Sequence, residues 1–203
     1  MNIPTGWNDI TIEQYQNLCN NINDTSLNEL ELIVSNISVL CNIEYSDILK
    51  LPLKETTRIS NELEFIGQVP DSKFINKFII DKTIYSVLPD VSKMTYGQFK
   101  ALSHYTKENT NYNLHFIMAL FCYEEGTTYD KDFESRAELF RKRLDMGVVF
   151  PLSGFFLELL KRFVTVIQHY SLERAERIVS EIGQEIQSLQ QTNSSTKHSV
   201  GSM

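Results

Sequence analysis

The stretch KMTYGQFKAL, at Lys93–Leu102, repeats in outline the stretch DITIEQYQNL at Asp9–Leu18. When the two are aligned on threonine, both give Thr, then Gln three residues later, then an aromatic residue, then Leu. Thr-x-x-Gln is a capping box, in which the hydroxyl and the amide satisfy free backbone groups at the start of a helix. Both stretches therefore predict the first turn of a helix.

The repetition has two explanations. An ancient duplication of one helical half would produce it, with an offset of 84 residues between Thr11 and Thr95 (95 − 11 = 84). Two unrelated but favourable helix starts would produce it as well. Either explanation predicts one helical half on each side of the centre of the chain.

Apolar residues at helical spacing predict further helices along most of the chain. In the first of these, Leu30, Ile33 and Ile37 are expected to face inward. Pro151 is expected to open the last and most apolar helix. The predicted ranges are 27–41, 52–66, 111–125, 134–147 and 151–170.

The centre of the chain carries a strand pattern instead. Phe74–Ile80 and Thr83–Leu88 are rich in Ile, Phe, Tyr and Val, and only Asp81 and Lys82 separate them, which predicts a β-hairpin. A lone hairpin is marginal in water, so it must pack on helices or pair with another chain. Its apolar side chains point to both faces, and the expected partner contacts are Phe78, Ile79, Ile84 and Tyr85.

These patterns predict a mainly α fold. We expect one helical, bundle-like domain over residues 1–191, with the hairpin inserted near 74–88. Residues 192–203, TNSSTKHSVGSM, are small and polar and predict a flexible C-terminal tail. Its apolar residues, Val200 and Met203, are expected to be secondary partner contacts.

Composition limits the function. The net charge of −7 argues against general binding of nucleic acid, which needs a basic face. Three widely spaced cysteines predict reduced thiols and no disulfide framework. The most apolar stretch, residues 148–167, is interrupted by charged residues and by Pro151, so no membrane span is expected.

No catalytic, phosphate-binding or metal-binding motif is present in the sequence. His115 and Cys122 are seven residues apart and could share a helix face, but no second cluster completes a zinc site. The basic run Arg141–Arg143 is flanked by acidic residues and is interpreted as a solvated helix face, with a phosphate contact as the alternative. An acidic loop is also interpreted as solvated, with weak calcium binding or a carboxylate pair for hydrolysis as its alternatives; it contains Glu124, Glu125, Asp130, Asp132 and Glu134. No cofactor and no enzymatic activity are expected.

Two apolar features have both a core and a contact interpretation. Trp7, the single tryptophan, precedes the first capping box and is either a plug on the core or an anchor in a neighbouring subunit. The run GFFLELLKRF at Gly154–Phe163 is either core or a groove for a partner.

Three short motifs carry a resemblance to a known group. They are the opening at Trp7–Thr11, the hairpin segment Phe78–Val87 and the stretch Asp90–Phe99, and the pattern of Asn113–Asp130 agrees with them. Together they resemble uncharacterised virion or tail-assembly proteins of tailed bacteriophages, over about two thirds of the chain.

The resemblance implies a structural or assembly role at the head–tail connector or tail, in a virion assembled in the bacterial cytoplasm. It implies contacts with other phage structural proteins, a homo-oligomer or ring, and no cofactor. One alternative is a tail-assembly chaperone that is absent from the mature virion. The other is a small enzyme whose site is assembled from residues distant in the sequence.

Overall fold

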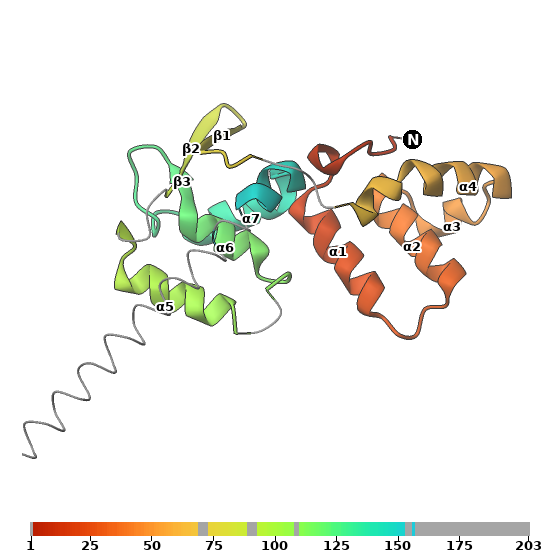
Figure 1. The fold of residues 1–203 in the computed structure, drawn as a ribbon, viewed down its shortest axis with the longest axis horizontal. Coiled ribbons are helices and arrows are strands. Elements are labelled where there is room, and N and C mark those ends of the chain that lie inside the picture. The colour runs from red at the N-terminus through yellow and green to blue at the C-terminus, as the bar shows by residue number, and fades with distance from the viewer. Residues whose placement is uncertain (1, 69–72, 89–92, 108–109, 153–155, 157–203) are drawn as a thin grey trace, which may run out of the picture. The chain divides into compact units, whose positions relative to one another are not determined.

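A computed structural model describes residues 2–68, 73–88, 93–107, 110–152 and 156. The chain divides into two units, Met1–Phe156 and Leu157–Met203, and all described residues lie in the first unit. That unit is mainly helical, as the sequence predicted, and contains a small three-stranded antiparallel sheet (Figure 1). The expected domain end near 191 and the expected tail lie outside the described residues.

The first quoted phrase begins helix α1 (Ile12–Asn23), and its capping box is present. The Thr11 hydroxyl accepts from the Gln14 backbone N–H, and Gln14 Oε1 accepts from the Thr11 backbone N–H. The amide group of Gln14 also donates to the Leu40 carbonyl at 3.0 Å. Leu40 lies near the end of α2 (Glu29–Cys41), so α2 runs back along α1.

The second phrase repeats this arrangement. Thr95 and Gln98 form the capping box of α5 (Tyr96–Tyr105), and the Gln98 amide donates to the Leu120 carbonyl at 3.0 Å. Leu120 is near the end of α6 (Leu114–Phe121), which packs on α5. Each phrase therefore starts a helix and ties that start to the end of the following helix. The presence of an equivalent hydrogen bond in both halves agrees with both explanations of the repeat.

Loss of either threonine hydroxyl should lower the free energy of unfolding. Thr11→Ala and Thr95→Ala are each expected to cost about 1 kcal/mol, because one backbone donor per helix loses its acceptor. Gln98→Ala should cost more, since Gln98 is buried and holds both the cap and the Leu120 carbonyl. Urea denaturation measures all three. An unchanged midpoint for Thr95→Ala would show that the hydroxyl does not stabilise the helix start.

Shorter helices complete the N-terminal half. They are η1 (Trp7–Asp9), α3 (Tyr45–Ile48), α4 (Leu53–Glu62) and η2 (Glu64–Gly67). The helix predicted over 52–66 is thus α4 followed by a 3-10 turn, with Pro52 just before its first residue.

The sheet corrects the prediction of a lone hairpin. Strands β1 (Lys77–Ile80) and β2 (Thr83–Val87) pair as predicted, but β3 (Cys122–Glu124) pairs with the other edge of β2. The end of the helix predicted over 111–125 is therefore a strand. This segment is extended because its backbone pairs with β2 and with the residue after β2. The Leu88 N–H donates to the Phe121 carbonyl, and the Glu125 N–H donates to the Ile84 carbonyl.

Helix α7 (Phe133–Arg143) ends earlier than the predicted 147. Leu144 is extended, its carbonyl accepts from the Ile12 N–H at 3.1 Å, and the Met146 N–H donates to the Ile10 carbonyl at 2.7 Å. These bonds join the start of α1 and the residues just before it to the chain after α7. A further helix is described over 146–152, so Pro151 lies inside it and does not open it.

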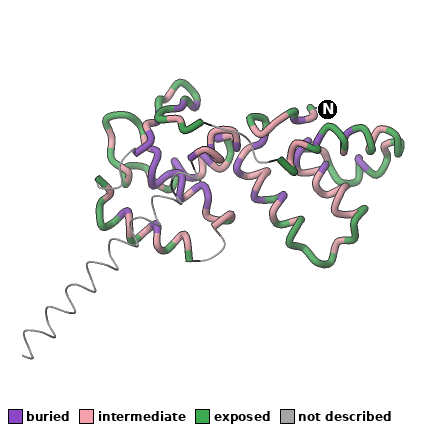
Figure 2. The backbone as a smooth tube through the Cα atoms, viewed as in Figure 1, coloured by how far each residue is buried: buried purple, intermediate pink, exposed green. Residues whose placement is uncertain are grey.

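One part of the core lies between α6, α7 and the inner face of the sheet, and another lies along α1 and α2, where Leu18 and Ile37 are buried. Helix α6 is buried along almost its whole length (Figure 2), and Phe121 and Phe140 are fully buried. Phe156 stacks on Phe121 with ring centroids 4.1 Å apart, so this member of the apolar run at 154–163 belongs to the core. The other residues of that run lie outside the described part of the chain.

Candidate interaction surface

The hairpin turns through Asp81 and Lys82, which both have positive φ, at 46° and 71°. Positive φ at both central residues is typical of the type I′ turn, whose twist matches that of two paired strands. The turn fixes the register, with Phe78 opposite Tyr85 and Ile79 opposite Ile84. Because side chains alternate between faces, these two pairs lie on opposite sides of the sheet.

The inner face of the hairpin is core. Phe78 and Tyr85 are buried, they stack at 5.6 Å, and their rings lie 5.7 and 5.0 Å from that of Phe140. The prediction that Phe78 and Tyr85 contact a partner is therefore wrong. The physical reason is that α7 presents Phe140 to this face, and the aromatic side chains gain more from that burial than from an open position.

The outer face of the hairpin is open. Ile79 is 68% exposed and Ile84, directly opposite, is 43% exposed. Phe74, which precedes β1, is also exposed. The structure thus places the predicted contact residues Ile79 and Ile84 side by side on a water-facing surface. We call the exposed pair Ile79 and Ile84 the isoleucine pair.

Two ion pairs involve residues close in the chain to the isoleucine pair. Lys77 Nζ lies 2.6 Å from a carboxylate oxygen of Glu125, and Arg143 Nη2 lies 2.7 Å from one of Asp81. All four side chains are about half exposed, so each pair stabilises the fold only weakly. They do hold charged groups of both signs beside an apolar centre, which is the usual anatomy of a protein contact.

The basic run Arg141–Arg143 is paired within the chain. Arg141 bonds to Glu13 and Glu138, Lys142 to Glu138, and Arg143 to Asp81. The hydrogen bonds from Arg141 and Lys142 lower the pKa of Glu138 to about 2. This arrangement fits the interpretation of the run as a charged helix face and leaves little of it for a phosphate.

Trp7 is held inside the chain. Its indole N–H donates to the Gln68 carbonyl at 3.0 Å, and its ring makes edge contacts with Tyr15, Phe65 and Phe150. These contacts agree with the plug interpretation. Trp7 is half-buried, and its role as an anchor in another subunit stays a prediction. The other two candidates, Val200 and Met203, lie outside the described residues.

His115 and Cys122 do not form a metal site with the neighbours that the structure describes. Cys122 lies in β3, and His115 Nδ1 is 3.1 Å from the Gln16 amide nitrogen. Gln16 also donates to the Asn111 and Tyr112 carbonyls, both at 2.9 Å. Across the described ranges, no three His, Cys, Asp or Glu side chains gather as metal ligands.

Burial lowers the pKa of His115 to about 4, and the nearby Arg141 cation adds to the effect. An unfolded histidine has a pKa near 6.5, so between pH 6.5 and 4 this histidine binds a proton in the unfolded chain but not in the folded chain. The free energy of unfolding should therefore fall as the pH drops through this window, by up to about 3 kcal/mol.

Denaturation curves measured between pH 7.5 and pH 4 test this expectation against a His115→Gln control. The control should lose stability less steeply over the same range. Equal slopes for the two proteins would show that His115 does not contribute to the pH dependence.

Sequence reasoning missed the buried residue Arg136. Its guanidinium donates to the Ala119 carbonyl at 3.1 Å and to the carbonyls of Tyr129 and Lys131, so it holds the acidic loop against α6. Its Nε has no hydrogen-bond partner among the described residues, and burial lowers its pKa. A basic residue four positions after Asp132 looks like an ordinary surface residue in the sequence, so no local signal marked it.

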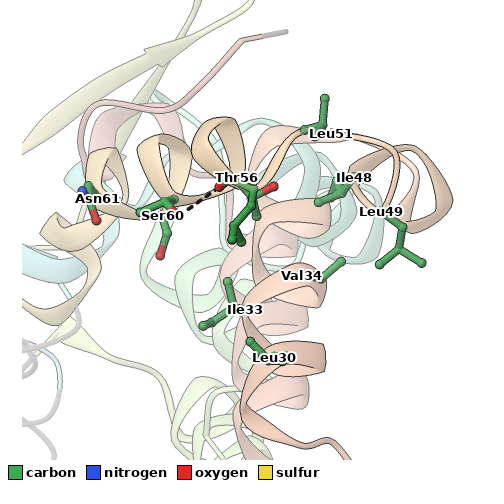
Figure 3. A pocket seen from close by; sticks show the side chains of 11 residues that line it. Leu30, Ile33, Val34, Ile48, Leu49, Leu51, Thr56, Ser60 and Asn61 are labelled. Carbon is green, nitrogen blue, oxygen red and sulfur yellow. Dashed lines mark hydrogen bonds between the residues drawn. The ribbon is translucent and has the colours of Figure 1, made fainter.

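An apolar groove also escaped the sequence analysis. It has a volume of about 430 Å³ and lies between α2, α3 and α4 (Figure 3). Leu30, which was expected to face inward, is 74% exposed at this groove, and Leu49 and Leu53 are exposed beside it. Ile33 and Val34 are only half-buried at the groove, so the predicted apolar stripe of α2 is only partly covered.

None of the helices in the described part of the chain combines the length and the apolar character that a membrane span requires. Comparison of the chain with protein-family models, with curated proteins and with solved structures finds no match in any of the three.

Proposed function

We propose that this chain is a non-enzymatic structural or assembly component of a tailed-bacteriophage virion, at the head–tail connector or tail. It acts through protein–protein contacts with other phage structural proteins and with copies of itself, and it is assembled in the bacterial cytoplasm. The sequence resemblance gives the phage setting. The observation that carries the contact role is the exposed isoleucine pair, held on a sheet whose opposite face is core.

The small exposed apolar area of the isoleucine pair favours an assembly of many copies over a complex of two molecules. Burying the exposed parts of Ile79 and Ile84 would contribute roughly 2–3 kcal/mol. One such contact is weak, because a millimolar complex already requires about 4 kcal/mol. Many copies in a ring add their contacts without paying the full entropy of association each time.

The apolar groove favours one second candidate, a tail-assembly chaperone. Exposed leucines along a groove between helices are suited to an amphipathic helix from another protein. A chaperone would bind such a helix during assembly and leave before the particle matures.

The two candidates differ in where the chain is found. A structural component remains in purified particles at a copy number set by ring symmetry, whereas a chaperone is abundant in the infected cell and absent from particles. Quantitative mass spectrometry of both fractions separates them. Particles that assemble normally without the chain would contradict both candidates.

A further inference from the structure

Strand β1 leaves its outer edge open. The Val87 N–H donates to the Asn76 carbonyl at 2.9 Å, which places residues 76, 78 and 80 as the ones whose backbone groups face β2. The N–H and C=O groups of Lys77 and Ile79 therefore point away from β2. No strand in the part of the chain that the structure describes lies on that side of β1.

We infer that β1 of a second copy of this chain pairs antiparallel with β1 at this edge, with Ile79 opposite Ile79. An antiparallel pair of identical strands is related by a twofold axis, so the contact closes on itself as a dimer. The Ile79 N–H donates to the Ile79 carbonyl of the second copy, and the Ile79 carbonyl accepts from the Ile79 N–H of that copy. The two sheets then become one sheet of six strands.

Charges on β1 and in the turn after it favour this register. With Ile79 opposite Ile79, Lys77 of each copy lies opposite Asp81, the first turn residue of the second copy. Each then extends an existing ion pair, since Lys77 already contacts Glu125 and Asp81 already contacts Arg143. A slide that places Lys77 opposite Lys77 would set like charges against each other, which is unfavourable.

Pairing would enlarge the apolar surface. Ile84 is opposite Ile79 within each copy, and Ile79 would be opposite Ile79 between copies, so four isoleucines would form one row across the outer face. The inference rests on the proposed function in one respect, because it takes this row of isoleucines as the surface that contacts other virion proteins. The pairing of two copies can be tested without it.

Cysteine cross-linking of the full chain tests the register. In a Cys19→Ser background, Ile79→Cys places two sulfhydryls on directly opposite residues with Cα atoms about 5.5 Å apart, which a disulfide can span. Ile84→Cys is the matched control, because its copies would lie three strand spacings apart, about 14 Å, beyond disulfide reach. On mild oxidation we expect a covalent dimer from Ile79→Cys only.

Charge exchange tests the same contact without cysteine. Lys77→Asp alone puts Asp opposite Asp81, and Asp81→Lys alone puts Lys opposite Lys77, so each variant should dimerise about tenfold more weakly than the original chain. Mixed together, the two variants form heterodimers in which both positions carry opposite charges. Sedimentation should show the mixture associating more strongly than either variant alone.

Three results would contradict the pairing of two copies through β1. The inference is overturned if the chain stays monomeric at about 0.1 mM, a concentration at which weak dimers form. It is also overturned if Ile84→Cys cross-links as readily as Ile79→Cys, or if the mixed charge variants gain nothing. None of these results bears on whether the chain is found in phage particles, so the proposed function is judged separately.

Discussion

Replacing both Ile79 and Ile84 by lysine is expected to abolish incorporation of the chain into particles while its helical circular-dichroism signal persists. Both side chains lie on the outer face of the hairpin, so the change removes apolar contact area without entering the core. Two buried lysines in a contact would also lack partners for their charges. Complementation of a phage that lacks the chain, followed by analysis of its particles, measures the effect.

Ile22→Lys is the matched control for this experiment. Ile22 is an exposed isoleucine on α1, away from the hairpin, and its replacement should leave incorporation unchanged. If the double variant unfolds, the outer face of the hairpin belongs to the core. If it is incorporated normally, the contact lies elsewhere on the molecule.

Phe140→Ala is expected to have the largest effect on stability. Phe140 is fully buried on α7, and it carries the packing of Phe78 and Tyr85 onto that helix. Truncating a buried phenylalanine removes its transfer free energy and leaves a cavity, at a cost of about 3–5 kcal/mol. Urea denaturation should show the midpoint falling accordingly.

Leu53→Ala serves as the comparison for Phe140→Ala. Leu53 is 82% exposed on α4, so the same kind of truncation should change the free energy of unfolding by no more than about 0.5 kcal/mol. A similar, small effect for Phe140→Ala would mean that the sheet is not anchored on α7.

Local signals allowed much of the fold to be predicted. The capping boxes at Thr11 and Thr95 are complete within four residues, so their sequence alone identifies the helix starts. The hairpin was predicted for the same reason, because two strand-forming runs flank a two-residue turn. Strand β3 was missed because Cys122–Glu124 follows an apolar helix without a break, and only pairing with the distant β2 makes it a strand.

The interaction surface could be predicted only in part. Alternation along β1 and β2 showed that one face would be core and the other open, and Ile79 and Ile84 were named on that basis. It did not show which face α7 would cover, so Phe78 and Tyr85 were named as well. Arg136 and the groove beside Leu30 arise from helix packing, which leaves no mark on a short stretch of sequence.

Mass spectrometry of purified, tail-bearing particles made from the genome that encodes this chain tests its virion role most directly. We expect its peptides in a fixed ratio to those of the other structural proteins, at a copy number that matches a ring symmetry. Absence from such particles, with the chain abundant in the infected cell, would contradict a structural role and favour the chaperone.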